Sequence, residues 1–255
     1  MADAPDPLFL LQQDGIYVPS EPVLSLTQAF EFRSYLSSVP VYRHHIAGKA
    51  TESAPNFATA WKQGWSVFAP KTEDVIKAPH WFETALSYMS LAKAYFRQQP
   101  RMYSISAFWT TPAEGPLYGD TQTWHRDQDD KFQMTLFMLG SDVPDPSEGA
   151  HLYQRGTHRT PDADLGRDPP SPPPCGIVST VYGPAGTLVV ADTWGLHKAI
   201  RPAKLPRLLV WARYAVANPP FTYVNDGLAP VSRDLLGDRY PTDPELQEAV
   251  RLVAV

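Results

Sequence analysis

Cysteine is almost absent from this chain of 255 residues, in which Cys175 is the only one. A single thiol excludes an internal disulfide and a cluster of thiolate metal ligands. Charged residues form only 19% of the chain, and its lysines and arginines are scattered rather than gathered into a stripe, with a net charge of -5. Because the electrostatic footprint of nucleic-acid binding is missing, a small molecule is the expected partner.

Long apolar runs are also missing. No stretch approaches the roughly 18 consecutive apolar residues that a transmembrane helix needs. The segment from Met1 to Asp6 lacks the basic region and apolar run of a secretory signal. Both absences favour a soluble, cytoplasmic protein with no membrane partner. Hydrophobic residues still form 43% of the chain, and without a clear internal linker we expect a single domain spanning residues 1–255.

Proline, by contrast, is abundant: 27 of 255 residues, or about 11%, is roughly twice the average usage. Proline fixes φ and lacks an amide donor, so this composition predicts short elements joined by many loops. The segment Pro161 to Gly176 is especially rich in proline and cannot form a central strand. It is either a loop near an active-site mouth or a surface excursion, and the sequence leaves both open.

Helical spacing of apolar residues is confined mainly to the N-terminal part, about residues 1–100. A short helix or turn is expected at residues 8–14, followed by a break at Gly15 and a strand start. Residues 25–38 predict a helix that Ser25 caps, and residues 79–100 predict the clearest helix, packed on the outside of a sheet. Residues 41–72 are ambiguous, with loops and one or two strands.

The period becomes strand-like in the core, about residues 101–216. The expected strands are short, rich in β-branched and aromatic residues and bounded by glycine or proline: 102–111, 122–127, 131–139, 150–155, 177–182, 187–192 and 207–215. Seven such strands favour a sandwich or jelly roll. The tail, residues 217–255, is expected to be irregular with a last helix at 243–253.

One motif carries metal chemistry. His125 and Asp127 are two residues apart, so on an extended backbone both side chains project to the same side. His197 follows a predicted buried strand and a possible kink at Gly195. Two imidazoles and one carboxylate on one face of an ion form the facial triad of non-haem iron(II) oxygenases, which leaves positions open for catalysis. We therefore predict that His125, Asp127 and His197 bind iron and are the catalytic residues.

The strand after His197 carries two arginines. Strand alternation places Arg207 and Arg213 on one face together with Leu209 and Trp211. A buried guanidinium is costly unless an anion pairs with it, and the distal carboxylate of 2-oxoglutarate is a suitable bidentate partner. We predict Arg207 as this anchor, with Arg213, the exit residue of the strand, as the alternative.

At this point the sequence resembles the phytanoyl-CoA dioxygenase-like family of iron(II)/2-oxoglutarate oxygenases. The resemblance is loose over residues 8–216 and good over residues 123–159 and 183–214. Its motifs are Gln12-Gln-Asp-Gly-Ile-Tyr17, Trp124-His-Arg-Asp127, Gln133-Met-Thr-Leu-Phe-Met-Leu139, Glu148-Gly-Ala-His151, Gly156-Thr-His-Arg159 and the segment from Gly183 to His197.

This resemblance implies a fold that is mainly β with flanking helices, namely a double-stranded β-helix (a jelly roll, cupin-like). It implies that His125, Asp127 and His197 hold Fe(II), that Arg207 binds the co-substrate 2-oxoglutarate, and that O2 is the second co-substrate. The implied reaction is oxidation, most often hydroxylation, of a C–H bond of a small molecule with release of succinate and CO2.

Two positions refine what the resemblance implies. The family often places Ser or Thr two residues after the late histidine, where this chain has Ala199, so another hydroxyl, Thr135, is the candidate to contact the co-substrate. Related halogenases replace the carboxylate ligand by a small residue. Since Asp127 is retained, hydroxylation is favoured over halogenation.

Other interpretations stay open. A cupin-like protein could hold a metal as a sensor without turnover, and an isomerase or hydrolase on the same fold could use zinc or manganese without O2. His151 and His158 could form a second metal pair, although surface or supporting roles are favoured. Gln128, Asp129 and Asp130 could touch substrate, but a solvated acidic turn is the favoured expectation. The sequence does not identify the substrate.

Overall fold

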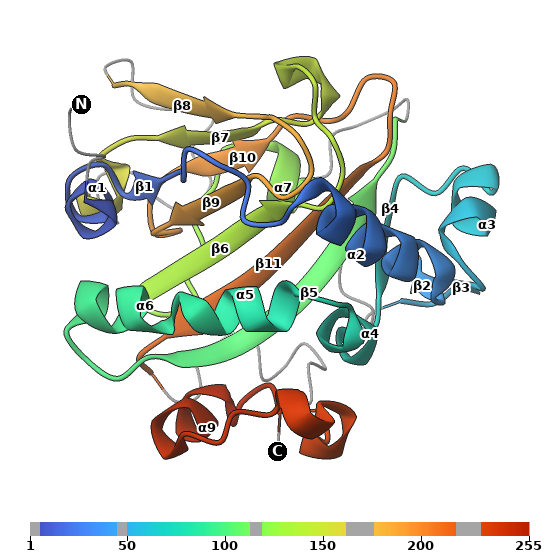
Figure 1. The fold of residues 1–255 in the computed structure, drawn as a ribbon. Helices are drawn as coiled ribbons and strands as arrows, with labels where there is room; N and C mark the ends of the chain where they lie inside the picture. Colours follow the sequence, from blue (N-terminus) through green and yellow to red (C-terminus); the bar gives the residue numbers. More distant parts are fainter. Residues whose placement is uncertain (1–5, 45–49, 113–118, 162–175, 218–230, 255) are drawn as a thin grey trace.

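The computed structural model describes residues 6–44, 50–112, 119–161, 176–217 and 231–254 (Figure 1). The predicted proline-rich loop lies almost wholly outside these residues, as does Cys175. Within them, no helix is both long enough and apolar enough to cross a bilayer.

A large sheet of eight antiparallel strands forms the centre of the fold. Its order is β1-β9-β6-β11-β5-β4-β2-β3. In chain order the strands are β1 (Ile16–Tyr17), β2 (Val41–Tyr42), β3 (Ser53–Ala54), β4 (Val67–Pro70), β5 (Arg101–Thr110), β6 (Gln133–Leu139), β9 (Leu188–Ala191) and β11 (Arg207–Ala215). The three longest, β5, β6 and β11, lie side by side, because their apolar and aromatic side chains can be buried on both faces.

A smaller sheet covers one face of the large one. It consists of β7 (His151–Gln154), β8 (Val178–Val181) and β10 (His197–Ala199), in the order β10-β7-β8. Figure 1 shows these strands above β9 and β6. Phe137, Tyr153, Val181 and Trp211 belong to one buried cluster that joins the two sheets. The fold is therefore a double-stranded β-helix with flanking helices, as predicted.

Helices cover the opposite face of the large sheet. Their bounds are α1 (Pro7–Asp14), α2 (Leu26–Ser38), α3 (Phe57–Lys62), α4 (Thr72–Lys77), α5 (Trp81–Ser87), α6 (Met89–Phe96) and α9 (Pro244–Val250), and α7 (Gly119–Gln122) precedes the metal motif. In Figure 1, α5 and α6 run across the sheet. The apolar faces of these helices share a second buried cluster with Leu208, Val210 and Tyr214 of β11. The hydroxyl of Tyr214 donates to the carbonyl of Ala85 at 2.7 Å.

Side-chain alternation along β11 follows the prediction. Leu208 and Val210 pack with the helices, whereas Leu209 and Trp211 belong to the cluster between the sheets. The helix predicted at residues 25–38 is also confirmed, and Ser25 caps it through a reciprocal pair of hydrogen bonds with Gln28.

Several expected elements differ from the structure. The single helix expected over residues 79–100 is two helices, because the amide of Tyr88 donates to Ala85 in a tighter turn that interrupts the α-helical pattern. The strand expected over residues 122–127 is wrong: α7 ends at Gln122, and only a single bridge follows, at His125. This segment is mostly polar and lacks the apolar alternation that would hold a strand against a core.

The N-terminal part contains more sheet than expected. Residues 41–72 hold three short strands and α3, and all of the strands from β1 to β4 join the large sheet. Three of these four strands have only two residues, too few for a periodic pattern to show. The description of residues 1–100 as helical was therefore incomplete. The tail helix expected over residues 243–253 is α9, capped by the side chain of Asp243.

Candidate metal centre

His125 and His197, the two histidines of the predicted triad, are paired through their backbones. The amide of His125 donates to the carbonyl of His197 at 3.1 Å, and the amide of His197 donates to the carbonyl of His125 at 2.9 Å. Two residues further, the amide of Asp127 donates to the carbonyl of Thr193 at 2.8 Å. These three bonds join residues that are 66 to 72 positions apart in the sequence, and they hold the backbone of the ligand residues in place.

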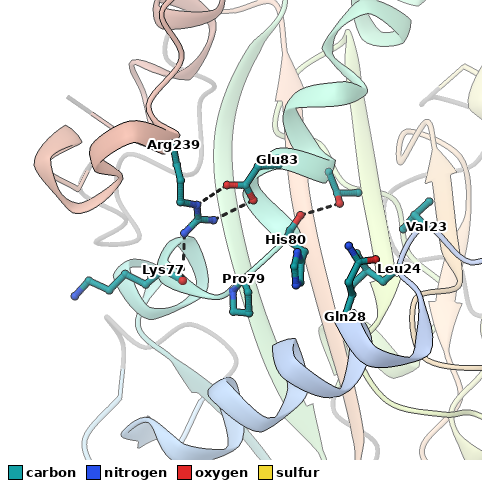
Figure 2. Close-up of a pocket in the computed structure, with 9 residues that line it drawn as sticks. Val23, Leu24, Gln28, Lys77, Pro79, His80, Glu83 and Arg239 are labelled. Atoms are coloured by element: carbon teal, nitrogen blue, oxygen red, sulfur yellow. Dashed lines mark hydrogen bonds and ion pairs between the residues drawn. The ribbon is translucent and has the colours of Figure 1, made fainter.

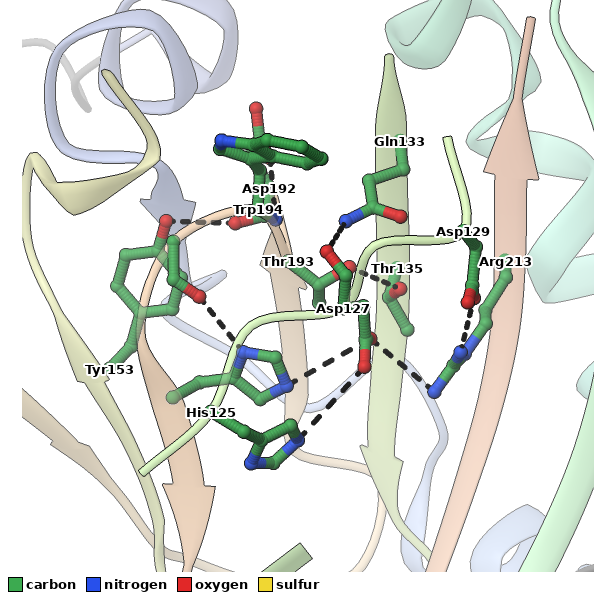
Figure 3. A network of polar contacts seen from close by, with 12 residues as sticks. His125, Asp127, Asp129, Gln133, Thr135, Tyr153, Asp192, Thr193, Trp194 and Arg213 are labelled. Atoms are coloured by element: carbon green, nitrogen blue, oxygen red, sulfur yellow. Dashed lines mark hydrogen bonds and ion pairs between the residues drawn. The ribbon is translucent and has the colours of Figure 1, made fainter. Parts of the chain in front are cut away.

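The three side chains converge on one point. Nε2 of His125 lies 4.0 Å from Oδ1 of Asp127, and Nε2 of His197 lies 3.9 Å from Oδ2. One ligand atom from each residue lies within 4.8 Å of the others, and all three residues are buried (Figure 3). Nitrogen and oxygen ligands bind a divalent transition metal at about 2.0 to 2.2 Å, so donors around one shared ion lie about 3 to 4 Å apart. The residues therefore fit a single ion.

Both imidazoles present the ligating nitrogen to this point. Nδ1 of His125 is 2.9 Å from the carbonyl oxygen of Thr123, and Nδ1 of His197 is 3.0 Å from that of Gly195. Because a carbonyl oxygen only accepts hydrogen bonds, each Nδ1 carries the proton and donates it. The lone pair of each Nε2 therefore faces Asp127, which is the tautomer that metal binding requires.

The electrostatics also favour the ligating protonation states. Burial is the main reason that the pKa of His197 is lowered to about 4, and the neighbouring His125 lowers it further. Burial alone would raise the pKa of Asp127, but Arg213 and the two histidines outweigh it and lower the pKa to about 2. At neutral pH the site thus holds a neutral His197 and an ionised Asp127.

Arg213, the alternative co-substrate anchor, is occupied by carboxylates. Its Nη1 lies 2.7 Å from Oδ2 of Asp129, and its Nη2 lies 3.4 Å from Oδ2 of Asp127 (Figure 3). The hydroxyl of Tyr103 also donates to Asp129, at 2.8 Å. The expectation of a solvated acidic turn is wrong for Asp129, which is only 7% exposed. Arg213 and Asp129 together support the metal-facing carboxylate.

Arg207 is in a very different environment from Arg213. It is 1% exposed, and its guanidinium lies over the ring of Phe108, 5.8 Å from the centroid. Its Nη1 donates to the carbonyl of Gly149 at 2.7 Å, whereas its Nε is buried and has no hydrogen-bond partner in the described part of the chain. No ion pair links Arg207 to any described residue, and burial lowers its pKa to about 10. Among the residues that the structure describes, Arg207 is thus a buried cation without a counter-charge.

Thr135 lies on β6, directly opposite Arg213 in the sheet. Its hydroxyl oxygen is 3.2 Å from that of Thr193, whose side chain is one of the influences that lower the pKa of Asp127. Thr135 is therefore linked to the carboxylate side of the triad. Its contact with a co-substrate stays a prediction.

Behind His197 is a group of residues whose role the sequence did not reveal. The hydroxyl of Tyr153 donates to the carbonyl of Asp192 at 2.8 Å, and the hydroxyl of Tyr95 on α6 donates to Oδ2 of Asp192 at 2.6 Å. A Cβ on Gly195 would lie 2.0 Å from the hydroxyl of Tyr153, so only glycine fits there. Gly195 therefore lets the backbone pass close to the hydroxyl of Tyr153, and this path places His197 at the site. No pattern in the sequence marks Tyr95 or Asp192.

The two other histidines considered as metal ligands do not meet. His158 contacts the carbonyl of Gln12, at 3.3 Å from its Nε2, whereas His151 points into the space between the sheets beside Phe137. Thr157 supports the segment that leads to His197, because its hydroxyl donates to the carbonyl of Gln154 and accepts from the amide of Leu196.

A separate groove lies on the helical face of the sheet, between α2 and the start of α5 (Figure 2). Three of its ionisable side chains, those of His80, Glu83 and Arg239, already have partners. Arg239 pairs with Glu83 and donates to backbone carbonyls, and His80 pairs with Glu31 at 2.9 Å. This groove contains none of the triad residues.

Comparisons with known proteins bear on the fold. No family model matches the chain, and no curated protein matches it in sequence. Among solved structures, the 2-oxoglutarate-dependent carbocyclase SnoK from nogalamycin biosynthesis aligns with a TM-score of 0.59 and 18% identity, covering 84% of each chain. The chain has the fold of non-haem iron, 2-oxoglutarate-dependent enzymes.

Two further structures with this fold contain the co-substrate. The epimerase SnoN, in complex with Fe3+, 2-oxoglutarate and nogalamycin RO, aligns with a TM-score of 0.58 and 17% identity, covering 86% of this chain and 87% of its own. EctD from S. alaskensis, with 2-oxoglutarate and 5-hydroxyectoine, aligns with a TM-score of 0.55 and 14% identity, covering 86% of this chain and 79% of its own. At these identities the likeness establishes the fold, and the chemistry has to be argued from the residues.

Proposed function

We propose that this chain is an Fe(II)- and 2-oxoglutarate-dependent dioxygenase that hydroxylates a C–H bond of a small-molecule substrate and releases succinate and CO2. One observation carries the proposal: Arg207, a buried guanidinium with no counter-charge among the described residues, accompanies a converging triad of two histidines and a carboxylate. The triad accounts for a metal alone, whereas the unpaired cation calls for an anionic ligand as well.

Each residue has a defined task in this proposal. His125 and His197 offer neutral nitrogens, Asp127 offers the charged oxygen, and the three occupy one face so that the remaining positions stay open. Arg207 neutralises the distal carboxylate of 2-oxoglutarate and thereby orients the other end of the molecule toward the triad. Arg213 keeps Asp127 ionised and in place. Burial of all these groups excludes water from the reacting atoms.

When bound, the ferrous ion activates O2, and 2-oxoglutarate supplies two of the four electrons that O2 needs and leaves as succinate and CO2. The protein contributes position, charge and exclusion of water. Thr135 stays our candidate for an additional contact with the co-substrate.

The observed environment of Arg207 argues against the two alternatives. A metal-dependent isomerase or hydrolase that needs no dicarboxylate, and a metal-holding sensor, would both leave this buried cation without an anion. The structures of SnoN and SnoK are described as an epimerase and a carbocyclase, so the same fold serves several oxidative outcomes. Hydroxylation is our choice because Asp127 is retained and the sequence resembles a family in which it predominates.

The same resemblance leads us to propose that the chain belongs to the phytanoyl-CoA dioxygenase-like family. We further infer that residues 1–255 act as one domain in the cytoplasm. In support of the single domain, β1 and β4 from the N-terminal part pair with β9 and β5 of the core.

The experiment that tests the function starts from protein loaded with Fe(II) and 2-oxoglutarate under anaerobic conditions and mixed with a metabolite extract. After O2 is admitted, mass spectrometry is expected to show a compound heavier by one oxygen and an equal amount of succinate. A compound lighter by two hydrogens would support the enzyme class but contradict hydroxylation. If the metal-loaded protein does not bind 2-oxoglutarate at all, the proposal is wrong.

Asp127→Ala and His125→Ala provide the matched controls. Both variants are expected to keep the fold, as circular dichroism would show, and to lose substrate-dependent succinate formation, since each removes one metal ligand. Turnover at the wild-type rate in either variant would contradict the assignment of the metal centre.

A further inference from the structure

His151 on β7 is a buried histidine that the metal centre does not use. Its side chain is not among the three that converge on the metal point, and the residue is only 3% exposed. Its Nε2 is buried and has no hydrogen-bond partner in the part of the chain that the structure describes. Buried polar atoms in native proteins are nearly always satisfied, so a ligand that completes this one is the natural explanation.

The ring of His151 faces the space between the two sheets. It packs against Phe137, with ring centroids 4.8 Å apart, and stacks near His197, with centroids 5.8 Å apart and planes at 24°. In the small sheet His151 is paired with Ala199 of β10. The methyl group of Ala199 offers no polar atom, so the neighbouring strand does not satisfy the imidazole.

Arg207 enters the same region from the large sheet. It donates to the carbonyl of Gly149, two residues before His151, and a Cβ on Gly149 would lie 2.7 Å from Cδ of Arg207. The charge of Arg207 is also one of the causes, after burial and His197, that lower the pKa of His151. Nε of Arg207 and Nε2 of His151 are thus two buried nitrogens without hydrogen-bond partners among the described residues. The electrostatic influence of Arg207 on His151, and the stacking of His151 near His197, place both side chains near the triad.

We propose that His151 is a second binding residue for the distal carboxylate of the co-substrate, to which its Nε2–H donates a hydrogen bond while Arg207 supplies the charge. This inference rests on the proposed function and adds a specificity-determining residue to it. A neutral imidazole carries one N–H, which suits a site where Arg207 already balances the carboxylate charge. His151 then favours a 2-oxo acid with a distal carboxylate over one without.

The test uses His151→Phe, which keeps the ring and removes the donor. Calorimetry under anaerobic conditions measures the binding of 2-oxoglutarate and of oxalate to protein loaded with Mn(II). Oxalate chelates the metal but has no distal carboxylate. We expect the dissociation constant for 2-oxoglutarate to rise about tenfold or more, as for the loss of a hydrogen bond to a charged group, with those for oxalate and Mn(II) unchanged.

Two further variants sharpen the result. His151→Gln, whose amide can donate, is expected to recover part of the affinity for 2-oxoglutarate. His80→Phe makes the same substitution in the outer groove and is expected to bind both ligands as the wild type does. In an Arg207→Met background, His151→Phe is expected to cost less affinity than it does alone, because the two side chains hold the same carboxylate.

Two outcomes would overturn the role of His151. If His151→Phe binds 2-oxoglutarate as tightly as the wild type, there is no contact with the carboxylate. If the affinities for oxalate and 2-oxoglutarate fall equally, His151 has only a structural role. Failure of the proposed function is a different result: there, the wild-type protein loaded with Mn(II) does not bind 2-oxoglutarate.

Discussion

Arg213 Nη2 lies 3.4 Å from Oδ2 of Asp127, on the side of that carboxylate away from the two imidazoles (Figure 3). The same guanidinium binds Asp129 at 2.7 Å through Nη1. One cation therefore connects the metal-facing carboxylate to a second buried carboxylate. With both carboxylates and the arginine mostly buried, screening by solvent is weak and the interaction is strong.

Arg213→Met should consequently destabilise the protein and weaken metal binding. Removal of the cation leaves Asp127 and Asp129 buried without their shared partner, which typically costs about 3 kcal/mol or more. The change in unfolding free energy is measured by denaturant titration, and metal affinity by Mn(II) binding. Arg155→Met, which removes a partly exposed pair with Asp14 and a bond to the hydroxyl of Ser179, is the control and should cost about 1 kcal/mol or less. Equal effects of the two substitutions would contradict the supporting role of Arg213.

Gly195→Ala should displace His197. The added Cβ would lie 2.0 Å from the hydroxyl of Tyr153, a distance that real contacts do not reach, so either the ring or the segment leading to His197 has to move. We expect metal affinity to fall at least tenfold, as measured by Mn(II) titration. Tyr153→Ala in the same chain should recover part of that loss by making room.

Gly64→Ala is the matched control for this prediction. Gly64 has a positive φ of 73°, but a Cβ there would meet nothing within 4 Å. The substitution should cost about 1 kcal/mol of stability through its backbone conformation and leave metal affinity unchanged. Loss of metal affinity in Gly64→Ala would show that the effect of Gly195→Ala is not local.

The sequence alone predicted the residues of the candidate metal centre, because two of them are close together in the sequence and the third comes after an apolar strand. His125 and Asp127 are separated by one residue, and His197 follows the apolar strand β9. The three ligand side chains converge although residues 122–127 do not form the expected strand. A single bridge between His125 and His197 holds this segment in place. The geometry thus agrees with the predicted ligand set although the predicted local structure was wrong.

The partners of charged groups could not be predicted in this way. Alternation correctly placed Arg207 and Arg213 on the inner face of β11. It could not show that Asp129 would be buried beside Arg213, or that none of the described carboxylates would lie beside Arg207. Asp129 follows Asp127 in a polar segment, which looks the same in sequence whether it is solvated or buried. Whether Asp129 is buried depends on its contacts with Tyr103 and Arg213, which lie on two other strands.

Asp192 is expected to make the stability of the protein depend on pH near neutrality. Burial raises the pKa of this carboxyl to about 7, although bonds from Tyr95 and Trp194 oppose the shift. A group whose pKa is higher in the folded state contributes stability that is complete below the unfolded pKa of about 4 and is lost as the pH rises through about 7. The contribution lost between about pH 5 and pH 8 is on the order of a few kcal/mol.

Asp192→Asn isolates this contribution, because the amide is neutral at every pH. The difference in unfolding free energy between Asp192→Asn and the wild type should shift in favour of the variant by about 1 kcal/mol or more when the pH rises from about 5 to about 8. Denaturant titrations of both proteins at the two values measure it. A difference that does not change with pH would mean that Asp192 titrates in the folded protein as it does in the unfolded chain.

Arg207→Met should separate stability from binding. In the protein without ligands, the substitution removes a buried cation that has no counter-charge among the described residues, and the apolar side chain suits the neighbouring Phe108. The metal-free variant should therefore be as stable as the wild type or more stable, by about 1 kcal/mol, as found when buried ionic groups are replaced by apolar ones. Its affinity for 2-oxoglutarate should fall about a hundredfold, in keeping with the loss of a buried charge pair.

Thermal unfolding of the metal-free protein and calorimetry of the Mn(II)-loaded protein test the two halves of this prediction separately. A stable variant that no longer binds 2-oxoglutarate would show that Arg207 is needed for binding the ligand and does not stabilise the fold. A strongly destabilised variant would mean instead that the bond from Arg207 to the carbonyl of Gly149 is mainly structural, and the dicarboxylate would then need another anchor.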